Sequence, residues 1–262
     1  MPALIFDCDG VLADTELDGH LPAFNQTFAE FGLPVEWTAE RYKELVRIGG
    51  GKERIRSVLT PDVLDAAGAE HTDEAVDDLV GKLHQRKSAL YQERVREGAL
   101  PARPGVVRLV REAHDAGWSL AVASTSAEES VRAVLEHAVG DELAGAFGVY
   151  AGDVVASKKP APDIYELTLR ELGRDADDAV VVEDSENGVR AAVRAGIRTV
   201  MTLSGTSEDD DRSGAALVVS SLGDPSPGEA ARVVDDPHGV APGEAVTLDD
   251  MQQILTQPAP AQ

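Results

Sequence analysis

Short apolar runs alternate with amphipathic helical patterns along most of the chain. The runs that are short enough for buried strands are residues 3–6, 119–123, 147–150, 179–182, 198–203 and 216–219. Apolar residues with helical spacing lie between several of these runs, at residues 106–116, 128–138, 163–172 and 188–195. Strands that alternate with helices of about 10 residues are typical of a parallel sheet with helices on both faces. The pattern therefore predicts an α/β protein with a doubly wound parallel sheet.

The segment after the first strand has a different pattern, without a convincing strand run. Its residues with helical spacing are 21–31, 39–46, 53–59 and 73–96. An insertion that leaves a sheet at a strand's carboxyl end emerges beside the crevice where open α/β sheets bind ligands. We therefore expect core segments at 1–14 and 99–222, an all-helical cap domain at 15–98, and a partly disordered carboxyl-terminal extension at 223–262. Within the extension, a helix is expected at 247–255 and a disordered tail at 258–262.

Composition and charge narrow the class of protein. The 262 residues are 43% hydrophobic, which is enough for one substantial core and a smaller second one. The formal net charge of −23 repels nucleic acid and anionic lipid. No apolar run reaches the roughly 18 residues of a membrane span, no secretory leader is evident, and the single cysteine, Cys8, cannot form an internal disulfide. We expect a cytoplasmic monomer that binds neither nucleic acid nor membranes.

Two carboxylates, Asp7 and Asp9, directly follow the first predicted strand. Side chains two residues apart in an extended chain share one face, so both acids can point into the ligand-binding crevice. Two acids there suit one metal ion and one nucleophile. The alternative is an acidic turn that closes the strand, because Asp and Gly are ordinary turn residues.

Polar residues also follow three other predicted strands. The hydroxyl run 124–126 precedes a helix, where it either binds an anion or caps the helix. Lys158 and Lys159 precede a proline-stiffened turn, and a solvated charge pair is the alternative to a functional role. Glu183 and Asp184 end a buried strand and either form a site or cap the next helix.

Taken together, these strand ends match the needs of phosphoryl transfer. A phosphoryl group is negatively charged, Mg²⁺ prefers oxygen ligands, and a carboxylate is able to attack phosphorus to give an aspartyl-phosphate. Magnesium also shields the charge that keeps a carboxylate from approaching a phosphate. The conjunction favours the functional reading of each strand end over capping or chance.

The chain contains, in this order, the motifs DCDGVLADTE, STS, KKPAPD and VVVEDS. Together they resemble the four motifs of the haloacid dehalogenase superfamily of Mg²⁺-dependent phosphohydrolases, here with a helical cap inserted directly after the first motif. The resemblance extends to about residue 219. It implies a Rossmann-like haloacid dehalogenase core and a Mg²⁺ cofactor.

The resemblance also implies a role for each motif residue. Asp7 is the expected nucleophile, and Asp9 is the acid/base that protonates the leaving oxygen and then activates water. Ser124 and Lys159 hold the transferring phosphoryl group, and Lys159 is preferred to Lys158 because the family's lysine immediately precedes the proline. The hydroxyls expected to contact substrate beside Ser124 are those of Thr125 and Ser126. The implied metal site consists of Asp7, Asp9 through its backbone carbonyl, Asp184 and, beside it, Glu183.

Finer features, at residues 14–20, 49–54 and 151–155, are similar to the CbbY-type branch, whose enzymes remove one phosphate from xylulose 1,5-bisphosphate. The glycines at 49–51 with Lys52 and Arg54 offer N–H groups and two cations, which suit a second phosphate, although a hinge loop with solvated charges is the alternative. Lys87 faces either the substrate, as in related caps, or the surface. The cap residues expected to bind substrate are Glu16, His20, Gly50, Gly51, Lys52, Arg54 and Lys87.

These motifs imply a Mg²⁺-dependent sugar-bisphosphate phosphatase. We expect it to bind a phosphorylated sugar and to convert xylulose 1,5-bisphosphate to xylulose 5-phosphate through an aspartyl-phosphate. A mutase similar to β-phosphoglucomutase, a phosphatase for another small ester such as phosphoglycolate, and a phosphosugar-binding sensor stay open as alternatives. Core motifs do not separate phosphatase from mutase, whereas the intact nucleophile argues against the sensor.

Overall fold

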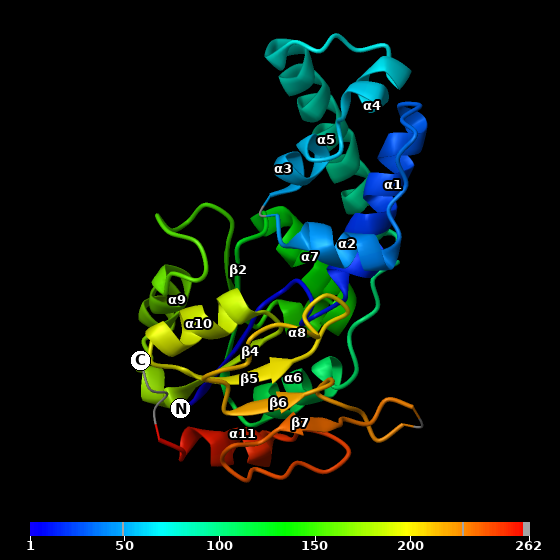
Figure 1. The fold of residues 1–262 in the computed structure, drawn as a ribbon. Coiled ribbons are helices and arrows are strands. Elements are labelled where there is room, and N and C mark those ends of the chain that lie inside the picture. Colours follow the sequence, from blue (N-terminus) through cyan, green and yellow to red (C-terminus); the bar gives the residue numbers. More distant parts are fainter. Residues whose placement is uncertain (49, 227, 259–262) are drawn as a thin grey trace. The chain divides into compact units, whose positions relative to one another are not determined.

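The computed structural model describes residues 1–48, 50–226 and 228–258, and it divides into two compact units (Figure 1). The first, which we call the core unit, comprises Met1–Asp14 and Leu100–Gln262. The second, the helical unit, is Thr15–Ala99. The chain therefore leaves the core unit directly after its first strand and loop and returns to it at Leu100.

Among the described residues of the core unit, seven strands form one sheet. They are β1 (Ala3–Phe6), β2 (Ser119–Ser124), β3 (Phe147–Ala151), β4 (Ala179–Glu183), β5 (Arg198–Thr202), β6 (Leu217–Val219) and β7 (Val233–Asp235). Their order in the sheet is β3-β2-β1-β4-β5-β6-β7. The first six strands are parallel, and β7 pairs with β6 in the antiparallel direction. Because β1 lies between β2 and β4, the carboxyl end of β1 is a topological switch point, where such sheets bind ligands.

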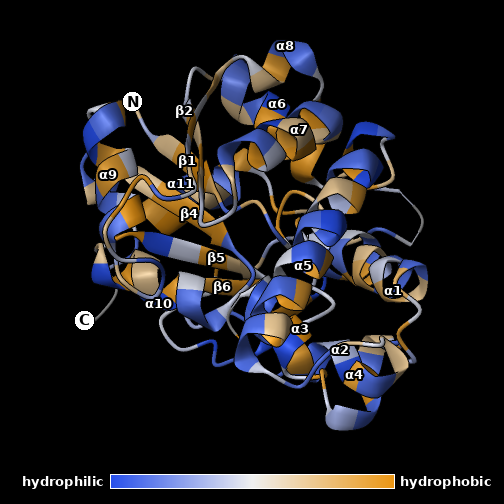
Figure 2. Ribbon diagram, turned by 90° about the horizontal axis from the view of Figure 1, so that it is seen from above, coloured by the Kyte–Doolittle hydropathy of each residue, from blue (hydrophilic) through white to orange (hydrophobic). Residues whose placement is uncertain are grey.

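Helices pack on the sheet, and the predicted doubly wound α/β fold is confirmed. The helices of the core unit are α6 (Val106–Asp115), α7 (Glu128–Val139), α8 (Asp141–Ala144), α9 (Asp163–Leu172), the 3₁₀-helix η2 (Ala176–Asp178), α10 (Glu186–Arg194) and α11 (Leu248–Leu255). One hydrophobic cluster joins α9 and α10 to the strands, with Ile5, Val181, Ile164 and Ala191 among its members. In Figure 2, β4 is almost entirely hydrophobic, whereas the helices carry hydrophobic and hydrophilic residues side by side. This contrast is expected for a central parallel strand that is buried on both faces.

Strand β7 was not predicted from the sequence. All of its residues are exposed, including Val233 at 44% and Val234 at 42%. An exposed edge strand of three residues shows neither the continuous apolar run of a buried strand nor a clear alternation, so its identity depends on pairing with β6. The helix predicted at residues 247–255 is present as α11, and Thr247 caps it in a capping box with Asp250. The tail expected to be disordered at 258–262 lies, beyond residue 258, outside the described residues.

The described residues of the helical unit form one π-helix and five α-helices. These are η1 (Thr15–His20), α1 (Leu21–Glu30), α2 (Ala39–Val46), α3 (Gly51–Arg56), α4 (Pro61–Ala66) and α5 (Asp73–Arg96). An aromatic cluster that includes Phe24, Phe28, Trp37 and Tyr42 forms the unit's own core. The helix α4 was not predicted, because its six residues span fewer than two turns and show no recognisable periodicity. None of the helices in the described part of the chain is long and apolar enough to cross a membrane.

Candidate active site

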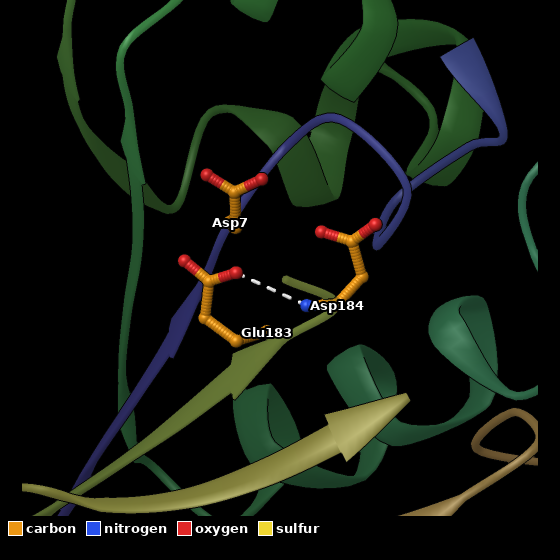
Figure 3. Close-up of side chains that lie close together, drawn as sticks. All are labelled: Asp7, Glu183 and Asp184. Atoms are coloured by element: carbon orange, nitrogen blue, oxygen red, sulfur yellow. Dashed lines mark hydrogen bonds between the residues drawn. The ribbon is translucent and has the colours of Figure 1, made fainter. Parts of the chain in front are cut away.

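Three carboxylates gather at the carboxyl ends of β1 and β4 (Figure 3). Asp7 directly follows β1, Glu183 ends β4 and Asp184 comes next. One carboxylate oxygen from each of the three lies within 4.8 Å of those of the other two. The backbone N–H of Asp7 donates to the carbonyl oxygen of Val182 at 2.9 Å, which fixes the first strand end against the second. The parallel pairing of β1 with β4 therefore brings the first and fourth sequence motifs together.

Lys159 places a positive charge among these acids. Its Nζ lies 2.6 Å from Asp7 Oδ1 and 2.6 Å from Glu183 Oε1, and it donates to the carbonyl oxygen of Ala123 at 2.9 Å. The side chain of Lys159 is only 8% exposed, whereas that of Lys158 is 55% exposed and pairs with Asp153. The lysine that precedes the proline therefore reaches the acids, and its neighbour points to solvent.

Burial dominates the electrostatics of the site. It raises the pKa of Asp7 to about 7, because the stabilising charge of Lys159 does not fully offset desolvation and the repulsion from Glu183 and Asp9. Burial, with the charges of Glu183 and Asp7, also raises the pKa of Asp184. For Lys159, burial opposes the charged form, but Asp7 and Glu183 outweigh it and raise the pKa of the ammonium. Three acids against one lysine leave an excess of negative charge that a cation is able to balance.

The donor set of this site fits a hard divalent cation. Asp7 and Asp184 are buried carboxylates, and oxygen ligands of this kind are those that Mg²⁺ prefers. Gly10 makes the approach of Asp184 feasible, because a Cβ at residue 10 would lie 2.0 Å from Asp184 Oδ2. Gly10 also has a φ of +79°, which glycine adopts without strain. The carboxylate of Glu183 is closely surrounded by donors, from Lys159, Tyr165 and the backbone N–H of Asp184.

The hydroxyl run at the end of β2 points to the same region. Ser124 is buried, and its Oγ accepts a hydrogen bond from the backbone N–H of Ser126 at 3.1 Å. The Oγ of Ser126 donates to Asp9 Oδ2, while Thr125 is exposed. Helix α7 has Ala127 at its N-cap, without a side-chain capping bond. The alternative that these hydroxyls serve as a helix cap is therefore wrong.

The acids at the end of β4 are also not helix caps. Ser185 takes that place at α10, where its Oγ accepts a hydrogen bond from the backbone N–H of Gly188 at 3.1 Å. Glu183 and Asp184 therefore remain available to the site, and the capping alternative is wrong for them as well.

Two residues near the site were missed by sequence reasoning. Arg103 donates to the carbonyl oxygens of Gly10, Leu203 and Ser220, so it ties the loop after β1 to the ends of β5 and β6. Tyr165 on α9 donates its hydroxyl proton to Glu183 Oε1 at 2.6 Å. A tyrosine on the apolar face of a predicted helix is the one signal that was available, because a buried tyrosine hydroxyl needs a partner. Nothing in the pattern around residue 103 marks the arginine.

In the helical unit, two of the predicted substrate contacts bind each other. The carboxylate of Glu16 accepts hydrogen bonds from Tyr42 and from Arg54, whose Nη1 lies 3.2 Å from Glu16 Oε2. Arg54 also donates through Nε to the carbonyl oxygen of Ile48 at 3.0 Å. The positive charge of Arg54 is therefore balanced within its own unit.

The other predicted residues of the helical unit lie near His84, which was not predicted, in a group that we call the cationic cluster. Its members are His20, Lys52, His84 and Lys87, with Gly50 and Gly51 at the start of α3. Lys87 is only 7% exposed, so the surface-facing alternative is wrong.

The side chains of this cluster come from three helices, η1, α3 and α5. The Nζ of Lys87 lies 3.0 Å from His20 Nδ1 and 4.6 Å from the centre of the Phe24 ring. A Cβ added to Gly51 would lie 3.0 Å from His84, which shows how closely α3 and α5 approach. Burial lowers the pKa of His84, and the charges of Lys87 and Lys52 lower it further. No role for His84 was predicted from the sequence, and Gly49, part of the predicted loop, lies outside the described residues.

Comparison with known proteins identifies the family of this chain. Residues 1–196 match the family model of the haloacid dehalogenase-like hydrolases. Protein CbbY from Cupriavidus necator is 43% identical over 246 residues, which are 90% of this chain and 94% of that protein.

Two solved structures are similar in fold as well as in sequence. A mutant of CbbY from Rhodobacter sphaeroides in complex with xylulose-(1,5)bisphosphate has a TM-score of 0.70 at 38% identity, over 84% of this chain and 95% of that one. The putative β-phosphoglucomutase from Thermotoga maritima has a TM-score of 0.61 at 27% identity, over 81% of this chain and 89% of that one.

Proposed function

The chain belongs to the haloacid dehalogenase-like hydrolases and is a phosphatase of that type, and we propose that it is a Mg²⁺-dependent enzyme for sugar bisphosphates. Its proposed reaction is the hydrolysis of xylulose 1,5-bisphosphate to xylulose 5-phosphate and inorganic phosphate. The observation that carries the chemistry is the contact of Lys159 with Asp7 and Glu183 beside Asp184. The similarity to a CbbY that is in complex with this bisphosphate supports the choice of substrate.

The proposed reaction has two steps at Asp7. In the first, a carboxylate oxygen of Asp7 attacks phosphorus, the bond from phosphorus to the sugar oxygen breaks, and Asp9 gives its proton to that oxygen. In the second, Asp9 takes a proton from water, the water oxygen attacks the phosphorus of the aspartyl-phosphate, and inorganic phosphate leaves as the Asp7 carboxylate re-forms. The hydrogen bond from Ser126 to Asp9 Oδ2 orients Asp9 for both transfers.

The remaining core residues balance the charge of the transferring group. We propose that Lys159 and Ser124 contact its oxygens, with Thr125 and Ser126 nearby. Asp7, Asp184 and the backbone carbonyl of Asp9 would hold Mg²⁺, with Glu183 beside them. Bound Mg²⁺ would neutralise phosphoryl charge and so permit a carboxylate to approach phosphorus.

For the second phosphate of the substrate, the cationic cluster is the proposed binding site. Lys87 and His20 are held in place by their mutual contact, and Lys52 is exposed on α3. Glu16 and Arg54 form an ion pair, so we propose that they contact sugar hydroxyls as a pair rather than as an isolated acid and base. A small monophosphate such as phosphoglycolate would leave the cationic cluster without a ligand.

The decisive experiment is a screen for phosphate release with and without Mg²⁺. Its substrates are xylulose 1,5-bisphosphate, xylulose 5-phosphate, phosphoglycolate and β-glucose 1-phosphate. We expect the highest kcat/KM for the bisphosphate and no turnover after chelation of the metal. Faster turnover of phosphoglycolate than of the bisphosphate would contradict the proposed substrate. Activity that survives chelation would contradict the proposed requirement for Mg²⁺.

One observation supports the mutase as the second candidate function, namely the structural similarity to a putative β-phosphoglucomutase. A mutase returns the phosphoryl group from Asp7 to a reoriented sugar, so it converts β-glucose 1-phosphate to glucose 6-phosphate without releasing phosphate. Assaying both products in the same reaction separates the two activities. Bisphosphate binding without formation of either product would instead support the phosphosugar-binding sensor.

The expected monomeric state, the cytoplasmic location and the absence of nucleic-acid and membrane binding stay predictions.

A further inference from the structure

Tyr165 is a polar residue in an otherwise apolar part of the core unit. It is fully buried on α9, in the hydrophobic cluster that includes Ala123, Ile164 and Val181. A tyrosine hydroxyl in such surroundings is costly unless it makes a hydrogen bond. Its partner is Glu183 Oε1, at 2.6 Å. A phenylalanine would fill the same space without this cost, so packing alone does not explain why residue 165 carries a hydroxyl.

Glu183 is held from several directions. Its Oε1 accepts hydrogen bonds from both Tyr165 and Lys159, and its Oε2 accepts one from the backbone N–H of Asp184 at 3.0 Å. The first turn of α10 closes on the carboxylate, since a Cβ at Gly188 would lie 1.9 Å from its carboxyl carbon. Glu183 therefore has little freedom to turn away from Lys159.

Lys159 connects this arrangement to the nucleophile. Its three ammonium protons have three acceptors, in Glu183, Asp7 and the carbonyl oxygen of Ala123. The ring of Tyr165 also lies under the ammonium, with its centre 4.9 Å from Nζ. A continuous chain of contacts therefore runs from the Tyr165 hydroxyl through Glu183 and Lys159 to Asp7.

We propose that Tyr165 is a positioning residue, which fixes Glu183 as the partner of Lys159 and thereby directs the ammonium at the phosphoryl group beside Asp7. In this assignment, Glu183 acts on Lys159 rather than as a ligand of the metal. Without the hydroxyl, Oε1 keeps only one donor, and the Glu183 carboxylate is able to shift together with the ammonium that it holds. Contact between Lys159 and the phosphoryl oxygens then weakens, while Asp7 and Asp184 still hold the metal.

The test is the variant Tyr165→Phe, with Tyr150→Phe as a matched control. Tyr150 lies on β3 and packs against the same hydrophobic cluster as Tyr165. Two dissociation constants are measured by calorimetry, that of Mg²⁺ and that of inorganic phosphate at saturating Mg²⁺. Because the probe is inorganic phosphate, the result does not depend on the proposed sugar substrate.

We expect Tyr165→Phe to weaken phosphate binding about 10- to 100-fold, as for the loss of one hydrogen bond to a charged group, and to change Mg²⁺ binding less than about twofold. Tyr150→Phe should change neither constant. Weaker Mg²⁺ binding with unchanged phosphate binding would assign Glu183 to the metal and overturn the proposal. No change in either constant would reduce the hydroxyl to a structural role and would also overturn it.

A double-mutant cycle shows whether the hydroxyl acts through Lys159. In a Lys159→Met background, Tyr165→Phe should cause no further loss of phosphate affinity, because the group that it positions is gone. A full additional loss would show that the hydroxyl acts on phosphate by another route. Thermal unfolding shows whether each variant is folded. If Tyr165→Phe does not fold, Glu183→Gln replaces it, and phosphate affinity should again fall more than Mg²⁺ affinity.

Discussion

The candidate site of the core unit and the cationic cluster of the helical unit differ in both charge and construction. The first has three acids around one lysine, and the second gathers lysines and histidines. The polar groups of the core site follow strands of a single sheet, whereas those of the cluster lie on the helices η1, α3 and α5. An acid-rich, rigid centre suits a cation and a fixed nucleophile, and a cationic group suits an anion. The comparison assigns the proposed phosphoryl transfer to the core site and the proposed selection of the substrate to the cationic cluster.

Removing the nucleophile should have the largest effect. We expect Asp7→Asn to lower kcat for phosphate release by at least about 1000-fold, because a neutral amide does not attack phosphorus. Asp153→Asn, an exposed residue after β3, is the matched control and should retain full activity. The measurement is steady-state phosphate release, with circular dichroism to verify folding. Full turnover by Asp7→Asn would exclude the aspartyl-phosphate mechanism.

The two adjacent lysines offer the next test. Lys159→Met should reduce kcat about 100- to 1000-fold, because it removes a buried charge that stabilises the transferring phosphoryl group. Lys158→Met removes an exposed charge of the same kind and should leave kcat within about twofold. Both variants are compared in the same phosphate-release assay. Similar losses of kcat in both variants would contradict the proposal that only the buried lysine acts on the phosphoryl group.

Metal affinity tests the acid-rich half of the comparison. Asp184→Asn should raise the Mg²⁺ dissociation constant about 10- to 100-fold, since it removes one of two buried carboxylates that fit the ion. Asp224→Asn, in the same unit but beside Arg108, is the control. Calorimetry with Mg²⁺ measures both variants without relying on turnover. An unchanged constant for Asp184→Asn would place the metal elsewhere.

The smallest predicted effect concerns the cationic cluster. Lys52→Ala should raise KM for a bisphosphate about 10-fold and leave KM for a monophosphate nearly unchanged, as for the loss of one charge-assisted contact. Lys82→Ala, an exposed residue of α5 that pairs with Asp78, is the control and should change neither. Equal effects of Lys52→Ala on the KM values of both substrates would contradict the proposal that the cationic cluster selects bisphosphates.

Most elements that build the core could be read from the sequence. The runs and spacings around β1, β2, β4 and α9 predict their bounds to within one or two residues. Parallel strands place their carboxyl ends at one edge, so Asp7 and Asp184 were predicted to meet there, and the resemblance to the family added Lys159. The helical unit was less accessible, because α4 and the π-helix are too short for a periodic pattern.

The sequence by itself determined the doubly wound sheet and the residues that follow its strands, because hydrophobic periodicity and the succession of strands and helices along the chain are local properties. Only the tertiary structure decided that Lys159 also donates to Glu183, that Arg54 is balanced by Glu16, and that Lys87 is buried. It also revealed the hydroxyl of Tyr165 on Glu183. These contacts join residues that are far apart in the chain, and their partners are set by packing between elements, which no local pattern records.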